Sequence, residues 1–156
     1  MTGSALNSER RLSEAEATYR RAIALDDRSA LAWKGLGIVL YNANRLEEAR
    51  DAHLRALAID PRFADAHLRL AFAEGRLGRL REALEHVRQA AAILPHDVPI
   101  RRSLGQHLFA TGDYREAVRE LEWVLTKTPA DGSVSSMLAE ARRRIGPPAG
   151  IPRSTP

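Results

Sequence analysis

Residues 30–61, ALAWKGLGIVLYNANRLEEARDAHLRALAIDP, have the pattern of two amphipathic helices separated by a short break. Small and apolar residues recur in the first half at i, i+3, i+4 and i+7, which places one stripe along an α-helix: Trp33, Leu36, Gly37 and Leu40. Asn44 interrupts this pattern, and Glu47 follows it at the spacing of a capping box. We therefore expect Asn44 to cap a second helix, which ends before Pro61 because the residue preceding a proline disfavours the helical conformation.

The same pattern recurs on both sides of this stretch, at a fixed step of 34 residues. Three of the recurring columns are Ala15, Ala49, Ala83 and Ala117; Glu14, Glu48, Glu82 and Glu116; and Leu36, Leu70, Leu104 and Leu138. A small residue in every repeat is expected where two helix backbones cross closely, since a larger side chain would hold them apart. The register of these columns predicts a structural repeat made of two helices.

A 34-residue helix–turn–helix period with W-x2-L-G, then A-x3-large, then Pro resembles the tetratricopeptide repeat family. The motif residues here are Trp33, Leu36, Gly37, Ala49, His53 and Pro61. His53 stands where the family usually has an aromatic residue, and His67 and Arg101 take the place of Trp33. The resemblance covers roughly residues 4–145 and implies an all-α, right-handed superhelical solenoid of about four repeats. The implied units are repeats near 1–29, 30–63, 64–97 and 98–131, followed by a capping helix at 133–145.

The N-terminal end departs from the repeat. Thr2 and Gly3 stand where a leucine–glycine pair is expected, so the first repeat lacks most of its leading helix. Ser13 and Glu16 have the spacing of a capping box and predict a helix that runs to about Leu25. The apolar face of that helix would be incompletely covered, which predicts weak homo-association through the N-terminal end.

The C-terminal end closes the array. The helix expected at 133–145 has Val134, Leu138, Ala139 and Ile145 on one face, as a terminal cap requires. Residues 146–156 are rich in proline and glycine, which predicts a disordered tail.

The composition favours a cytoplasmic protein with neither a membrane nor a nucleic acid as its partner. The 156 residues carry a formal net charge of +4, include no cysteine, and contain no apolar run of membrane-spanning length. The 24 basic residues are 22 arginines and 2 lysines, a bias that indicates a GC-rich bacterial source. Many arginines are interleaved with glutamate on the predicted helices, whereas nucleic-acid binding would require them on one surface.

No arrangement of residues predicts catalysis or metal binding. The five histidines do not pair at i, i+4 with another histidine or a cysteine. The sequence also lacks the P-loop, HExxH and GxSxG motifs. We therefore expect no enzyme activity, no catalytic residue, no metal and no cofactor.

The candidate binding site follows from the resemblance, because leading helices line a concave groove in tetratricopeptide proteins. Ten residues on a second stripe of these helices are expected in that groove: Lys34, Ile38, Tyr41, Leu68, Arg69, Phe72, Arg76, Arg102, Gln106 and Phe109. Cations alternate there with apolar side chains, which suits an acidic peptide with apolar anchors from an unidentified protein partner. In the competing interpretation the arginines are solvated and the aromatic residues pack on neighbouring helices.

Three functions are compatible with these observations. The leading one is a non-enzymatic scaffold for protein–protein contacts that binds a peptide segment. The others are a substrate-recruiting domain of a larger enzyme, of glycosyl- or sulfotransferase type, and a small secretion chaperone. The family's clamp for a C-terminal carboxylate falls here on Lys34, Ile38, Arg69, Pro99 and Ser103, where only Lys34 matches, so clamp activity is not expected.

Overall fold

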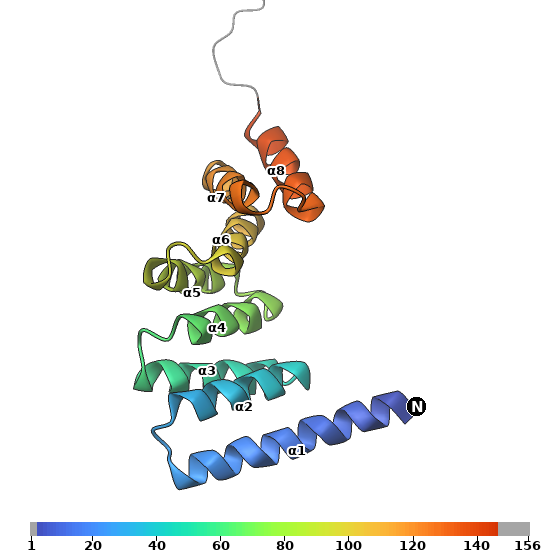
Figure 1. The fold of residues 1–156 in the computed structure, drawn as a ribbon, viewed down its shortest axis with the longest axis vertical. Helices are drawn as coiled ribbons and strands as arrows, with labels where there is room; N and C mark the ends of the chain where they lie inside the picture. Colours follow the sequence, from blue (N-terminus) through green and yellow to red (C-terminus); the bar gives the residue numbers. More distant parts are fainter. Residues whose placement is uncertain (1–2, 147–156) are drawn as a thin grey trace, which may run out of the picture.

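The computed structural model describes residues 3–146, with side chains described from residue 9 onward. All regular structure in this range is helical (Figure 1), as the repeat predicted. The eight helices are α1 (Gly3–Leu25), α2 (Ala30–Asn42), α3 (Leu46–Ile59), α4 (Ala64–Arg76), α5 (Leu80–Ile93), α6 (Val98–Thr111), α7 (Tyr114–Lys127) and α8 (Gly132–Ile145). Within residues 3–146, no helix is long and apolar enough to cross a membrane.

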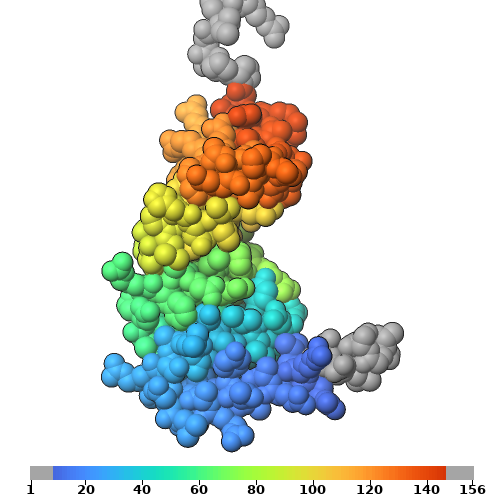
Figure 2. Space-filling view, in the orientation of Figure 1, coloured from blue at the N-terminus to red at the C-terminus, as the bar shows by residue number. Residues whose placement is uncertain are grey.

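The helices stack in chain order, and each packs on the next. Contacts also join α2 to α4 and α6 to α8, so the first helices of successive repeats are neighbours. Figure 1 shows that the helix direction turns along the stack, and Figure 2 shows one continuous column from α1 to α8. The molecule is therefore an all-α solenoid, in which each repeat is stabilised mainly by the repeats beside it.

The repeated small residues lie at close helix crossings. Ala49, Ala83 and Ala117 are fully buried. A Cβ atom on Gly37 would lie 2.4 Å from His53 Cε1, and one on Gly105 would lie 2.7 Å from Leu121 Cδ2. Because real Cβ atoms do not approach so closely, larger residues at these positions would push the paired helices apart.

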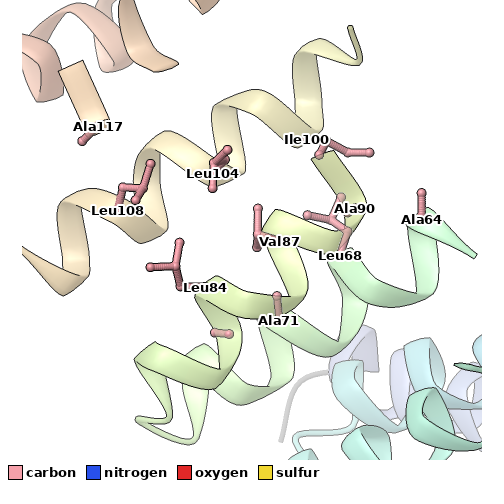
Figure 3. Packing of buried hydrophobic residues seen from close by; sticks show 11 residues of the cluster. Ala64, Leu68, Ala71, Leu84, Val87, Ala90, Ile100, Leu104, Leu108 and Ala117 are labelled. Carbon is pink, nitrogen blue, oxygen red and sulfur yellow. The ribbon is translucent and has the colours of Figure 1, made fainter. Parts of the chain in front are cut away.

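The largest cluster of buried apolar residues spans α4 to α7 (Figure 3). Leu84 and Val87 of α5 face Leu104 and Leu108 of α6, and Ala117 of α7 extends the cluster toward the C-terminal end. Smaller clusters continue the core through α2 and α3 and through α7 and α8. The core therefore runs along the solenoid axis and is not centred in one place.

The turn inside each repeat requires a left-handed backbone. Asn44, Gly78 and Gly112 lie 34 residues apart and have φ values of 61°, 79° and 87°. The next residue in each turn donates its N–H to the carbonyl five residues back, as Arg45 does to Leu40, which is the hydrogen bond of a Schellman motif. Asparagine is the non-glycine residue that best tolerates this conformation.

The predicted capping role of Asn44 is therefore wrong. Because Asn44 terminates α2, it is not placed to cap α3, whose N-cap is Arg45 without a side-chain cap hydrogen bond. Side-chain caps occur instead on α2, α6 and α8, whereas α4 has none. Ser29, Asp97 and Asp131 accept hydrogen bonds from the backbone N–H groups of Ala32, Ile100 and Val134.

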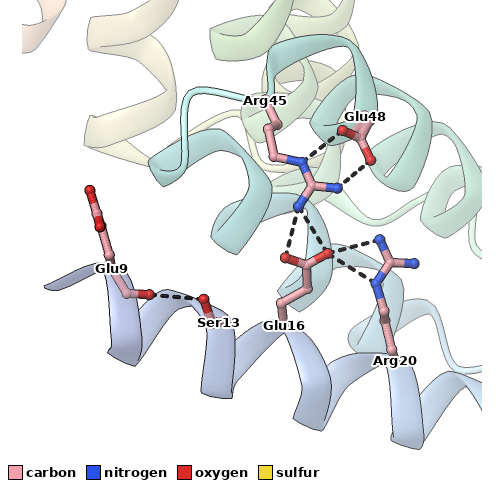
Figure 4. A network of polar contacts seen from close by, with 6 residues as sticks. All are labelled: Glu9, Ser13, Glu16, Arg20, Arg45 and Glu48. Atoms are coloured by element: carbon pink, nitrogen blue, oxygen red, sulfur yellow. Dashed lines mark hydrogen bonds and ion pairs between the residues drawn. The ribbon is translucent and has the colours of Figure 1, made fainter. Parts of the chain in front are cut away.

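The capping box predicted at Ser13 and Glu16 is also wrong, because α1 is continuous from Gly3. Ser13 donates its hydroxyl to the carbonyl of Glu9, one turn earlier in the same helix (Figure 4). Glu16 instead accepts hydrogen bonds from Arg20 and Arg45, at 2.8 Å each from their terminal nitrogens. This carboxylate thus joins α1 to the turn before α3, and the hydrogen bond from Arg20, together with Arg45, lowers its pKa.

The face of α8 differs slightly from the prediction. Val134, Leu138 and Ala141 are buried, whereas Ala139 and Ile145 are exposed. The 3.6-residue turn of a helix places Ala141 nearer than Ala139 to the line through Val134 and Leu138. The tail predicted to be disordered, apart from Gly146, lies outside the described residues.

The fourth residue of the first helix differs among the three complete repeats: it is Trp33 in α2, His67 in α4 and Arg101 in α6. In each repeat its side chain hydrogen-bonds to the backbone carbonyl six residues earlier. The pairs are Trp33 Nε1 to Asp27 O at 2.9 Å, His67 Nε2 to Pro61 O at 3.0 Å, and Arg101 Nη1 to Pro95 O at 3.3 Å. Each pair joins residues six apart. The departures from tryptophan at His67 and Arg101 therefore keep its hydrogen bond.

The residue facing this position changes with it. Trp33 packs against the cluster that contains Ala52, His67 Nδ1 lies 3.2 Å from His86 Nδ1, and Arg101 Nε lies 2.6 Å from Glu120 Oε2. These facing residues, Ala52, His86 and Glu120, are again 34 apart. The second repeat thus packs the large apolar Trp33 against the small Ala52. The next two repeats have a polar pair at the same two positions.

Candidate functional site

The ten predicted groove residues lie on three neighbouring helices, α2, α4 and α6. Eight side chains form or border one surface, which we call the α2–α4–α6 surface. Leu68 does not, because it is buried in the core with 9% of its surface exposed. Phe109 packs edge to face on Tyr114, with ring centroids 5.4 Å apart, and lines neither of the two hollows described next.

The first hollow lies between α2 and α4 and has a volume of about 60 Å³. Its lining residues are Ile38, Tyr41, Asn42, His53, Arg69 and Phe72. Four of them were predicted, and we call this hollow the His53 pocket. At its border, Arg76 lies over the Tyr41 ring, 5.2 Å from the centroid, and donates a hydrogen bond to Asn44 Oδ1.

The second hollow has a volume of about 240 Å³ and is lined mainly by α6, together with Val124 of α7 and with Thr128 and Asp131 between α7 and α8. Arg102 and Gln106 line it, as predicted, and so does Phe72. Phe72 therefore forms a wall common to both hollows. Its ring also stacks on His107 of α6, with centroids 6.4 Å apart, which fixes it between the two.

Acidic side chains of the same chain partly neutralise the cations of this surface. Lys34 Nζ and Arg69 Nε lie 2.8 and 3.2 Å from the two carboxylate oxygens of Asp65, and Arg102 lies 3.0 Å from Asp131. Burial opposes ionisation of Asp65, but the hydrogen bond from Lys34 and the charge of both cations lower its pKa below the ordinary value. With Arg76 included, four cations face two carboxylates, so the surface keeps a positive excess of two.

The groove prediction missed two pocket residues, Asn42 on α2 and, from outside the leading helices, His53. His53 belongs to α3, and its side chain reaches beneath α2 because Gly37 leaves space for the ring. Only 1% of its surface is exposed, and Nδ1 has no hydrogen-bond partner among the described residues. Desolvation, together with the charges of Arg69 and Lys34, lowers the pKa of His53 to about 4, while Asp65 opposes the shift. The sequence contained one indication of this role. His53 is polar, whereas the residues 34 and 68 positions later, Val87 and Leu121, are apolar and buried.

Sequence comparison decides the family. Two family models described as tetratricopeptide repeat match residues 1–62 and 76–141. The chain belongs to the tetratricopeptide repeat family. A comparison with curated proteins gave no match.

Several solved structures share this fold, and two of those named next are described as tetratricopeptide proteins. YrrB, described as having an unusual peptide-binding site, superposes with a TM-score of 0.78 at 24% identity, covering 90% of this chain and 72% of YrrB. A MamA structure gives a TM-score of 0.80 at 16% identity and covers 92% and 79%. The first tetratricopeptide domain of Spaghetti (RPAP3), bound to the HSP90 peptide SRMEEVD, gives 0.72 at 22% identity and covers 78% and 97%. At these identities the likeness concerns the fold.

The positions of the family's carboxylate clamp are occupied differently in this tetratricopeptide chain. Lys34 is engaged with Asp65, and Ser103 is buried. Elsewhere in the described part of the chain, no three histidine or acidic side chains converge in a way that could hold a metal ion. The α2–α4–α6 surface combines two hollows with an excess of positive charge.

Proposed function

We propose that this chain is a protein-interaction scaffold that binds an acidic peptide segment of a partner across the α2–α4–α6 surface. The observation that carries the proposal is the pair of hollows that share Phe72. Partly exposed apolar side chains that line hollows offer burial to a ligand, and such surfaces often mark binding sites. The two hollows would each take one side chain of a peptide that passes over Phe72.

The charge of the surface supports an acidic ligand. Asp65 is shared between Lys34 and Arg69, so one carboxylate serves two cations. A second carboxylate, supplied by the peptide, would complete the pairing with Arg69 at the edge of a desolvated pocket. Charge-assisted bonds of this kind contribute about 1.5–3 kcal/mol each, and about 1.4 kcal/mol changes affinity tenfold.

Two structural neighbours also favour peptide recognition. YrrB is described by a peptide-binding site, and the Spaghetti domain is bound to SRMEEVD, a peptide with three acidic residues. This chain shares their fold, while the clamp positions discussed above differ. We therefore propose the same class of ligand, an acidic peptide, with a mode of contact particular to this surface.

A selection experiment tests the proposal. Random 12-residue peptides displayed on phage are selected on the full chain, and the affinities of enriched peptides are measured by fluorescence anisotropy. Arg69→Glu should weaken them at least about tenfold, because repulsion adds to the lost bond. The matched control is Arg55→Glu, an exposed arginine of α3 that lines neither hollow. Equal loss in both variants would indicate diffuse electrostatic attraction, and absence of any enriched peptide would contradict the proposal.

A further inference from the structure

The size of the His53 pocket restricts what can enter it. Its volume is about 60 Å³. A water molecule occupies about 30 Å³ in the liquid, and a cavity that holds benzene measures about 150 Å³. The pocket thus has room for the head of a small side chain and is too small to enclose an aromatic ring.

The imidazole of His53 lines the pocket, and its Nδ1 has no hydrogen-bond partner among the described residues. Five buried side-chain atoms of the described residues lack hydrogen-bond partners, on Arg50, His53, Glu74, Arg101 and Glu120. Four of these atoms belong to residues in ion pairs. Glu74 pairs with Arg50 and His86, and Glu120 pairs with Arg101. His53 Nδ1 has neither kind of partner in the described structure. Buried polar groups left alone cost free energy, and each calls for an explanation.

Arg69 supplies the second polar group of the pocket. Its Nε donates to Asp65 Oδ1 at 3.2 Å, whereas its terminal nitrogens make no hydrogen bond with any residue that the structure describes. Its side chain is 43% exposed, so a ligand can reach these nitrogens. An apolar group in the pocket would shield Arg69 from water without bonding to it and would leave the buried His53 unsatisfied.

We propose that the His53 pocket binds the side-chain carboxylate of an aspartate within the peptide, held by the terminal nitrogens of Arg69 and by a protonated His53. This inference rests on the proposed function and names the anchor at that site. An aspartate has one methylene between its carboxylate and the backbone, so it places less side-chain volume in or near the small pocket than a glutamate does. An internal residue is favoured over a chain end because the surface continues past the pocket, through Phe72 to the second hollow.

Proton uptake follows from the same geometry. The charged groups facing His53 are Arg69 and Asp65 of α4 and Lys34 of α2, and desolvation is the main reason that its pKa lies at about 4 in the free chain. A carboxylate entering the pocket favours the imidazolium and raises the pKa of His53. The complex then binds more protons than the free chain, so affinity rises as the pH falls. A bound-state pKa of about 6 would make affinity at pH 5 about tenfold higher than at pH 8.

A small-molecule probe tests the pocket separately from peptide binding. The full chain is titrated with N-acetyl-aspartate N-methylamide up to about 100 mM, since the one or two charge-assisted bonds it makes predict only weak affinity. The ring Cε1–H signal of His53, assigned with His53→Leu, is followed by NMR from pH 8 to pH 4. The expected result is a rise in the pKa of His53 by at least about one unit with this probe and none with the asparagine analogue.

Two variants separate the possible failures. Arg69→Gln should weaken the probe at every pH, and His53→Leu should abolish the pH dependence of its binding. An unmoved His53 signal, or an equal response to the asparagine analogue, overturns the pocket assignment. If selected peptides bind through Arg69 but tolerate asparagine at every aspartate, the pocket assignment is wrong and the proposed function stands. A response to the probe without any peptide binder contradicts the proposed function alone.

Discussion

Lowering the pH from 8 to 5 should destabilise the free protein by about 2 kcal/mol through His53 alone. The pKa of this histidine is 6.5 in the unfolded chain and falls to about 4 in the folded one. The unfolded state therefore takes up a proton first as the pH falls, and stability present above pH 6.5 is lost. The full loss, reached below pH 4, is about 3 kcal/mol, since one pKa unit corresponds to about 1.4 kcal/mol.

The measurement is urea unfolding at pH 8, 7, 6 and 5, for the wild type and for His53→Leu. Leucine is a suitable replacement because Leu121 fills the equivalent place against Gly105 in this same chain. Other buried groups also titrate: desolvation raises the pKa of Glu74 and Glu120 and lowers that of His86. These groups are present in both proteins, so the difference between the two pH profiles isolates His53. Parallel profiles, with a constant difference from pH 8 to pH 5, would refute the reasoning.

Four further outcomes are expected. Ala83→Leu should cost about 1–3 kcal/mol in thermal unfolding, because Ala83 is fully buried at a helix crossing. Asn44→Gly should leave the melting temperature nearly unchanged, while Asn44→Val should lower it by an amount equivalent to about 1–2 kcal/mol, because valine resists the positive φ. In chemical denaturation, Arg101→Ala should destabilise the protein by about 3 kcal/mol, because it leaves Glu120 unpaired. The double variant Arg101→Trp with Glu120→Ala, which copies Trp33 and Ala52, should recover most of the lost stability. Sedimentation should reveal weak, concentration-dependent dimers that involve α1, and a strict monomer at high concentration would contradict this.

The architecture was predictable because small residues recur at a fixed step. The columns of Ala49 and Leu36 mark helix crossings and core positions, and the structure buries both except for Ala15, which is partly exposed in α1. The turns were predicted less well because asparagine favours both an N-cap and a left-handed residue. The repeat could have distinguished these two roles. Asn44 aligns with Gly78 and Gly112, and glycine at the equivalent positions indicates a positive φ.

The candidate surface was predictable only as a face of the leading helices. Helical residues three or four apart share a face, but their spacing does not show where that face ends and the buried core begins. Leu68 thus fell inside the core, and Phe109 fell on Tyr114. His53 was missed because it comes from the second helix of its repeat. It reaches the pocket through the space that Gly37 leaves, which depends on packing between helices.

In the proposed site, His53 would supply binding chemistry at the expense of stability. His67 and Arg101 are as polar as His53, yet each keeps a hydrogen bond to a backbone carbonyl and a facing partner, so the fold alone accounts for them. His53 has no such compensation, and a leucine in its place, as at Leu121, would remove the desolvation penalty. His53→Leu should therefore be more stable than the wild type below about pH 6 and lose the pH dependence of carboxylate binding. Stability and binding that change in opposite directions through one side chain are typical of a functional site, because its groups are arranged for a ligand and left unsatisfied without it.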